Sequence, residues 1–217
     1  MSAPVEPRTR PRLLLTGAWL LVAVTIGLAP LLGRELDSLP ALLALGAVYW
    51  GGCWLLAFFA GDRKHLAALW RTPLNRRPLE LVLTFLPVVA TLVVGFLPSV
   101  SRVPPPVLAA VFAVALINGV TEELFWRGAF VSRFPDDLKL GFLFPLLPFI
   151  SWHFALALVP GVRYEGGLPA LLGGAAVFGL CWGATLWRTR DLRSVTVAHV
   201  LTNAFAFTQL ALGNWVA

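Results

Sequence analysis

Two carboxylates and a guanidinium, those of Glu122, Glu123 and Arg127, lie within an otherwise apolar stretch of the sequence. Each such ionisable group costs about 2.5–3.5 kcal/mol at the centre of a membrane helix, so these groups usually face a cavity and serve a function. Glu123 and Arg127 are four residues apart with the acid first, the favoured order for an ion pair on one helix. Glu122 is predicted to point away from Arg127 and therefore needs partners from other segments. An ion pair that only stabilises the protein is the structural alternative for these residues.

Candidate partners for Glu122 are His153, in the stretch FISWHFALA, and His199 with Asn203, in the stretch VAHVLTNAF. A single histidine within a membrane helix is more often a packing residue than a ligand or a base. Two histidines together with a glutamate favour chemistry instead. His199 and Asn203 are four residues apart, so both project from one face of a helix. We expect these groups to converge in the cytoplasmic half of a helix bundle.

The amino-acid composition predicts that these polar groups lie inside a membrane. Of the 217 residues, 58% are hydrophobic and only 13% are charged. Apolar runs of about 18 or more residues are long enough to cross a bilayer. The sequence therefore predicts an all-α fold, a polytopic integral membrane helix bundle of about seven transmembrane helices. The predicted spans are 13–32, 40–60, 79–97, 107–130, 140–159, 168–187 and 195–216. A short interfacial helix is expected around 66–70, in the long connection after the second span.

Charge predicts the orientation of the bundle and a division of the chain. With the N-terminus in the cytoplasm, most basic residues, Arg8 among them, fall in cytoplasmic segments. The opposite side holds only Arg34, Arg102 and Arg163. This asymmetry follows the positive-inside rule and explains the net charge of +6 by attraction to an anionic inner leaflet. No nucleic-acid partner is indicated. Residues 1–105 are predicted to form N-terminal membrane helices with a basic cytoplasmic loop, and 106–217 a motif-bearing core, within one integral domain.

Three motifs on separate helices carry a resemblance to a known family. These motifs are E-E-x-x-x-R, F-x-x-x-H and H-x-x-x-N, formed by Glu122, Glu123 and Arg127, by Phe149 and His153, and by His199 and Asn203. In this order they resemble the CPBP family of intramembrane glutamic endopeptidases. That family is related to the CaaX prenyl endopeptidase and to bacteriocin-processing or self-immunity proteins. The resemblance covers about half of the chain, roughly 107–207.

The resemblance implies an intramembrane protease and a role for each motif residue. Glu122 would be the general base, and His153 would help to bind and polarise the attacking water. His199 and Asn203 would donate hydrogen bonds to the oxyanion, which their side chains are able to do. Glu123 and Arg127 would orient these groups, while Phe149 would pack beside them or line a substrate groove. The substrate would be a membrane-embedded or lipid-modified protein or peptide, cut at a cytoplasm-facing site in a bacterial or archaeal membrane.

Several alternatives remain open from the sequence. A mechanism without cofactors is favoured, but zinc held by Glu122, His153 and His199 is the alternative because His2Glu is a known catalytic zinc set. A non-proteolytic scaffold or self-immunity protein, or a small proton-coupled transporter, would also retain buried polar groups. The sequence does not determine the oligomeric state.

Other residues near the motifs are predicted to serve packing. Trp126 and Trp152 are expected to pack in the core, with the shaping of a groove as the alternative. Gly179 and Gly183 are expected to permit close helix approach.

Overall fold

The computed structural model describes residues 9–216, and this part of the chain contains helices and turns but no strand. The helices are α1 (Thr9–Glu35), α2 (Ser38–Ala60), α3 (Arg63–Arg71), α4 (Pro78–Thr91), α5 (Pro105–Glu122), α6 (Phe130–Arg133), α7 (Phe144–Ala157), α8 (Gly167–Thr189) and α9 (Leu192–Asn214). Three π-helical segments, η1 (Leu92–Phe96), η3 (Glu123–Ala129) and η4 (Lys139–Leu143), continue or begin longer helices, and η2 (Val100–Arg102) is a 3-10 turn.

Seven helical stretches within the described residues are long and apolar enough to cross a membrane. They lie within a few residues of the spans predicted from the sequence, so the prediction of a polytopic all-α bundle is confirmed. The predicted short helix at 66–70 is also present, as the longer helix α3. Arg8, which contributed to the predicted orientation, lies outside the described residues.

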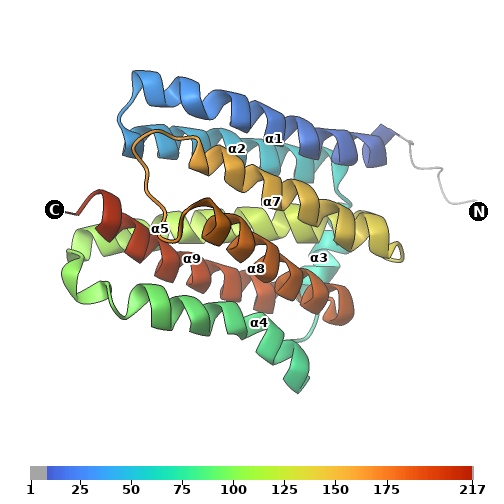
Figure 1. Cartoon of the computed structure of the whole chain (residues 1–217). Helices are drawn as coiled ribbons and strands as arrows, with labels where there is room; N and C mark the ends of the chain where they lie inside the picture. Colours follow the sequence, from blue (N-terminus) through green and yellow to red (C-terminus); the bar gives the residue numbers. More distant parts are fainter. Residues whose placement is uncertain (1–8, 217) are drawn as a thin grey trace, which may run out of the picture.

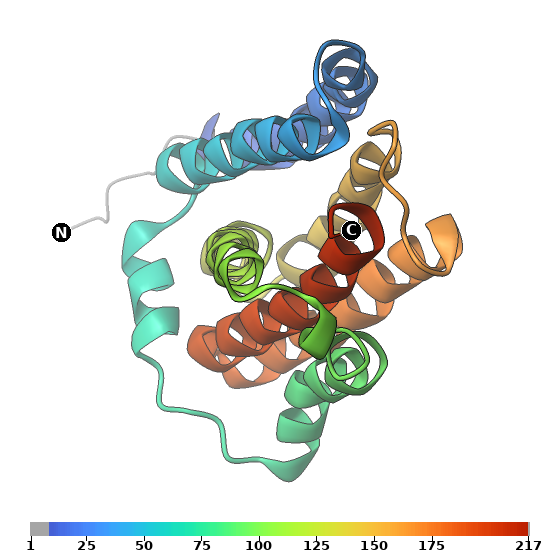
Figure 2. The ribbon, with the colours of Figure 1, turned by 90° about the vertical axis from the view of Figure 1, so that its left-hand side faces the viewer.

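Helix α5 and its continuation through η3 and α6 lie at the centre of the bundle (Figure 1; Figure 2). The hairpin of α1 and α2 covers one side of this central span, and α7, α8, α9 and α4 follow around the others. This position follows from the sequence, because the central span carries the ionisable residues that lipid cannot solvate. The central span therefore exposes its polar residues to neighbouring helices on several sides.

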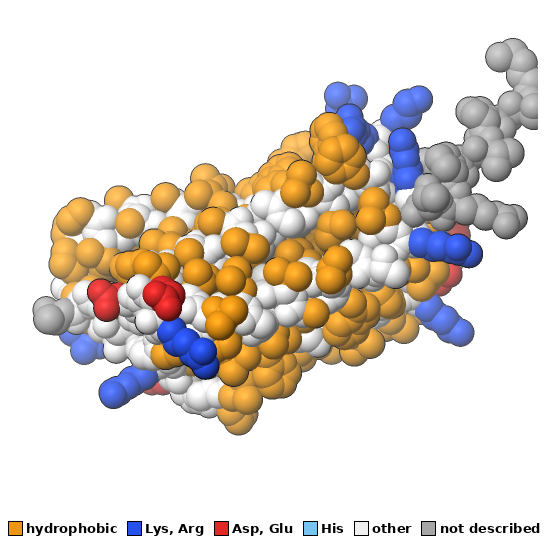
Figure 3. Space-filling model, turned by 90° about the horizontal axis from the view of Figure 1, so that it is seen from above, with side chains coloured by type: hydrophobic (Ala, Val, Ile, Leu, Met, Phe, Trp, Pro, Cys, Tyr) orange, Lys and Arg blue, Asp and Glu red, His pale blue; other side chains and the backbone are white. Residues whose placement is uncertain are grey.

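The outer surface of the bundle is apolar, as expected for contact with lipid. Large side chains such as Leu20, Phe59, Val94 and Leu147 are exposed on it. On the face shown in Figure 3, apolar side chains cover the length of the molecule, and Lys and Arg side chains gather at the end where α1 begins. A helix that is apolar all round is typical of a membrane span, so the multi-pass membrane assignment follows from both composition and arrangement.

Two buried apolar clusters pack the interior. One joins α1, α2, η3 and α7 and includes Tyr49, Trp126 and Trp152. The other joins α4, α8 and α9 and includes Trp182 and Leu192. Aromatic side chains from both clusters contact the polar residues of the central span, so these polar residues lie between the two clusters.

Helix α3 begins at a capping aspartate outside the membrane spans. Asp62 accepts hydrogen bonds from the backbone N–H groups of Lys64 and His65 and from the His65 ring. Partial burial opposes ionisation of Asp62, but the hydrogen bonds from His65 outweigh it and lower the pKa of this carboxyl. A carboxyl with a lowered pKa stabilises the fold at pH values above its unfolded pKa, and this contribution is lost as the pH falls through the folded pKa.

We expect Asp62→Ala to weaken α3 by about 1 kcal/mol, because the cap satisfies N–H groups of the first turn. Hydrogen exchange at neutral pH should show faster exchange of the α3 amides in the variant. The difference between wild type and variant should shrink as the pH falls from about 4, the ordinary pKa of an aspartate, through the lowered pKa of folded Asp62. Equal α3 protection at neutral pH would contradict the capping role.

Candidate active site

Glu122, the last residue of α5, is buried and its carboxylate is surrounded by hydrogen-bond donors. Oε1 accepts from Tyr49 OH at 2.7 Å and from Trp152 Nε1 at 3.0 Å. Oε2 accepts from Asn118 Nδ2 at 2.9 Å and lies 3.2 Å from His199 Nε2. A carboxylate offers about four acceptor positions, so each position on Glu122 faces a donor. Helices α2, α5, α7 and α9 therefore fix the orientation of this one side chain.

His199 joins the two glutamates. Its Nδ1 lies 2.8 Å from Glu123 Oε1, while its Nε2 faces Glu122. The ring stacks on Trp182, with 4.2 Å between ring centroids. When both carboxylates are ionised, only a doubly protonated imidazole donates to both of them. The buried arrangement thus suits an imidazolium between two carboxylates.

Arg127 completes the charge balance of the cluster. Its Nη1 lies 3.3 Å from Glu123 Oε1, so the ion pair predicted from the spacing is present. Its guanidinium also lies over the ring of Phe149, 4.0 Å from the centroid. Cations are attracted to the faces of aromatic rings, so Phe149 both packs and stabilises the arginine. Two carboxylates, Arg127 and a protonated His199 would have no net charge.

His153 and Asn203 border the cluster without hydrogen bonding to Glu122 or His199 in the described part of the chain. His153 is half-buried, and its Nδ1 lies 2.9 Å from the backbone oxygen of Phe149. Since that oxygen can only accept, Nδ1 carries the proton and a neutral His153 presents the lone pair of Nε2. Asn203 is buried one turn after His199, and among residues 9–216 its Nδ2 has no acceptor. Both side chains thus have a free hydrogen-bonding group beside the cluster.

The donors to Glu122 from outside the motifs were missed by sequence reasoning. Tyr49 on α2 stacks against Trp152, with ring centroids 3.6 Å apart, and accepts a hydrogen bond from Trp126 Nε1 at 2.5 Å. The two tryptophans do pack in the core, as predicted, but each also takes part in the hydrogen bonding around Glu122. The one signal for Tyr49 was a phenol within the apolar stretch VYWGGCW.

The backbone changes character at the motif. The sequence predicted a regular helix over 107–130, whereas the segment from Glu123 to Ala129 is π-helical. A π turn is wider than an α turn and changes the phase of the residues that follow; such turns are frequent at functional sites. Glu123 and Arg127 therefore lie on a segment whose geometry differs from that of a straight α-helix.

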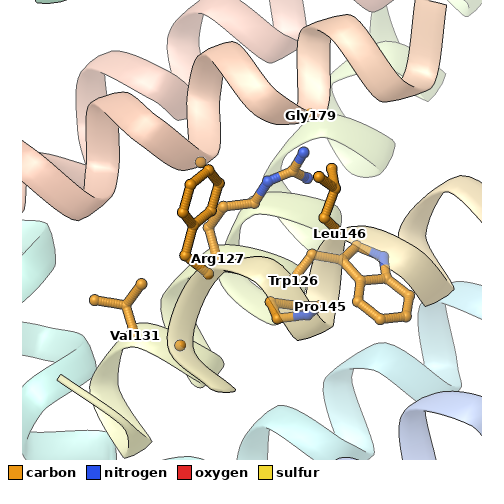
Figure 4. Close-up of a pocket in the computed structure, with 9 residues that line it drawn as sticks. Trp126, Arg127, Val131, Pro145, Leu146 and Gly179 are labelled. Atoms are coloured by element: carbon orange, nitrogen blue, oxygen red, sulfur yellow. The ribbon is translucent and has the colours of Figure 1, made fainter. Parts of the chain in front are cut away.

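A small cavity lies beside Arg127, between the central span, α7 and α8. Figure 4 shows the Arg127 side chain extending toward α8 beside Gly179. A Cβ atom at Gly179 would lie 2.7 Å from Leu146 Cδ1, 3.1 Å from Phe149 Cε1 and 3.2 Å from Arg127 Nη2. Gly179 therefore permits close packing against α8, as the sequence predicted. The groups that pack against it are side chains of neighbouring helices, and they include the motif residue Arg127.

We expect Gly179→Ala to destabilise the protein by about 1–3 kcal/mol, since overpacking forces neighbouring side chains to move. Gly173→Ala is the matched control on the same helix, because a Cβ atom there meets no atom within 4 Å. Thermal unfolding in detergent should show a lower midpoint for Gly179→Ala only. Equal midpoints for the two variants would show that Gly179 is not tightly packed.

The polar cluster does not assemble the zinc set considered from the sequence. Both ring nitrogens of His199 face carboxylates, and Nδ1 of His153 faces a backbone oxygen. Among the residues that the structure describes, no group of three or more His, Cys, Asp and Glu side chains has an arrangement that could hold a metal ion. A zinc ion on His199 would have to replace one of its carboxylate contacts.

A multi-pass helix bundle with Glu, His, Arg and Asn side chains buried in its apolar interior defines a membrane protein with an intramembrane polar site. The sequence model described as Type II CAAX prenyl endopeptidase Rce1-like matches residues 104–205. This match supports assignment to the CPBP, or CAAX protease, family and agrees with the resemblance carried by the three motifs. In general terms the chain is a CAAX-type intramembrane endopeptidase for membrane-associated peptide substrates. No curated protein and no solved structure matches the chain.

Proposed function

We propose that this protein hydrolyses a peptide bond of a membrane-associated protein or peptide, with Glu122 as the general base. One observation carries the proposal. Glu122 is buried in an apolar bundle, yet it contacts His199, a motif residue on α9. The same histidine contacts Glu123, from which it is separated by 76 residues in the chain. A purely structural ion pair would be satisfied by Glu123 and Arg127 alone, so the second carboxylate and the histidine indicate a chemical task.

In the proposed mechanism, the hydrogen bonds around Glu122 rearrange when substrate binds. The contact from His199 Nε2 is the longest of the four to Glu122. His199 keeps its Nδ1 contact with Glu123 and turns its Nε2 toward the carbonyl oxygen of the substrate. This movement frees Oε2 of Glu122 to accept a hydrogen bond from water. The lone pair of His153 Nε2 helps to hold the same water.

The chemical step then needs a base, an acid and an oxyanion site. Glu122 takes a proton from the water as the water oxygen attacks the carbonyl carbon. His199 Nε2 and the free Nδ2 of Asn203 donate hydrogen bonds to the resulting oxyanion. Glu122 returns its proton to the leaving amine as the C–N bond breaks, and the products are an amine and a carboxylic acid. These steps require no metal ion, so we propose a glutamate mechanism without zinc.

The basic segments support an orientation with the site reached from the cytoplasm. Arg133 ends α6, which directly follows the motif segment η3, and Lys139 begins η4 after the next turn. Substrates are therefore expected to be cut close to the cytoplasmic surface of the membrane.

The proposal is tested by mapping new protein N- and C-termini in native membranes with and without this protein. We expect a small set of membrane-proximal cuts that appear only when the protein is present. Identical terminus profiles would overturn the endopeptidase assignment. If deletion of the protein still produced a phenotype, a scaffold role or a proton path would then explain the buried cluster.

A further inference from the structure

Tyr49 reaches the Glu122 carboxylate from α2, a helix outside the segment 104–205 that matches the family. The direction of its hydrogen bond follows from its neighbours. Trp126 Nε1 lies 2.5 Å from the phenol oxygen, and an indole N–H only donates. The phenol oxygen therefore accepts from Trp126, and its single proton is left for Glu122 Oε1 at 2.7 Å.

A second route connects α2 to the other carboxylate oxygen. Trp50 Nε1 donates to Asn118 Oδ1 at 2.8 Å, and Asn118 Nδ2 donates to Glu122 Oε2 at 2.9 Å. Because the indole can only donate, it fixes which end of the Asn118 amide faces Glu122. Adjacent residues of α2 thus act on both oxygens of the same carboxylate, one directly and one through Asn118.

Tyr49 is placed to hold Glu122 without touching a substrate. Its side chain is fully buried, and its ring stacks on Trp152, which also donates to Oε1. Removal of the phenol oxygen alone would keep this stack and delete a hydrogen bond to the carboxylate. A hydrogen bond to a charged group contributes more than one between neutral groups, so its loss should affect the Glu122 carboxylate.

We propose that α2 supplies the positioning residues of this enzyme, with Tyr49 and the Trp50–Asn118 pair fixing the orientation of the Glu122 carboxylate for catalysis. This inference rests on the proposed role of Glu122 as the general base. It assigns a direct part in the site to the N-terminal helices, which carry none of the three family motifs.

Steady-state kinetics with a cleavable peptide substrate test the role of Tyr49. Tyr49→Phe should lower kcat about tenfold and leave KM within about twofold, since the lost bond orients the base and binds no substrate. Trp50→Phe should lower kcat in the same direction. The control for the phenol is Tyr164→Phe, the other tyrosine of the chain, whose OH donates to the backbone oxygen of Leu156. The control for the indole is Trp54→Phe, which loses a hydrogen bond to Thr121 on the same helix pair.

The contact itself is tested without any activity measurement. The chain contains 2 tyrosines, so a Tyr164→Phe protein labelled with ¹³C at the tyrosine ring carbon bearing the hydroxyl gives one NMR signal, from Tyr49. Glu122→Gln should shift this signal, because it replaces the acceptor of the phenol proton. Glu165→Gln, near the other tyrosine, should leave the signal in place.

The two measurements separate failure of the inference from failure of the proposed function. A Tyr49 signal that ignores Glu122→Gln overturns the inference, whatever the activity. A signal that shifts, together with an unchanged kcat in Tyr49→Phe, overturns the positioning role. If the wild-type protein cleaves no peptide, the proposed function fails and the positioning role fails with it, while the NMR result still reports the hydrogen bond.

Discussion

Replacement of Glu122 by glutamine is expected to lower the rate of peptide cleavage by about a hundredfold to ten-thousandfold, the usual contribution of a general acid–base group. Glutamine keeps the size of the side chain and cannot take a proton from water. Its amide nitrogen would also face one of the donors that now surround the carboxylate. In native membranes, the cuts that depend on this protein should disappear in the variant at matched protein abundance.

Glu165→Gln is the matched control for this experiment. Glu165 lies in the connection before α8, where its carboxylate hydrogen bonds to Gln209 at the surface. This control makes the same chemical change outside the site and should retain the wild-type cuts. Full activity in Glu122→Gln would show that another group activates the water, and Glu123 would then be the next residue to replace.

Replacement of Arg127 by methionine is expected to destabilise the protein by about 3–5 kcal/mol, because removal of one partner leaves a buried charge uncompensated. Glu123 would keep only His199 as a charged partner, and two carboxylates would share one cation. Thermal unfolding in detergent should show the loss as a lower midpoint, and less folded protein should accumulate in membranes.

A charge-balanced double variant distinguishes this electrostatic cause from loss of packing on Phe149. The pair Arg127→Met with Glu123→Gln removes both charges and leaves the methionine side chain on the aromatic ring. Most of the lost stability should return in the double variant. If the double variant is as unstable as Arg127→Met alone, the guanidinium acts through its packing instead of its charge.

The spans and the motif pairing could be predicted from the sequence because each depends on local spacing. Runs of apolar residues determine which segments cross a membrane. The four-residue separation of Glu123 and Arg127 determines that they pair on one helix. The division at residues 105 and 106 also came from local signals, since the motifs occur only after it, and it stays a prediction.

The surroundings of Glu122 could not be predicted because they depend on contacts distant in sequence. Tyr49 is separated from Glu122 by 73 residues, and Trp152 by 30. Aromatic residues are common in membrane spans, so a phenol or an indole in an apolar stretch does not show which acceptor it contacts. The π turn at Glu123 was also not predicted, because the amino-acid pattern there is that of an ordinary helix.

The partners of Glu122 also determine the order in which its site can be completed during synthesis. When Glu122 is synthesised, Tyr49 and Asn118 have already been made, whereas Trp152 and His199 have not. The nascent span must therefore enter the bilayer with two carboxylates and one arginine, before the histidine that bridges the carboxylates is available. Helix α2 precedes the central span in the chain and already carries a donor to Glu122. The N-terminal hairpin can therefore hydrogen bond to the buried carboxylate before α9 is inserted.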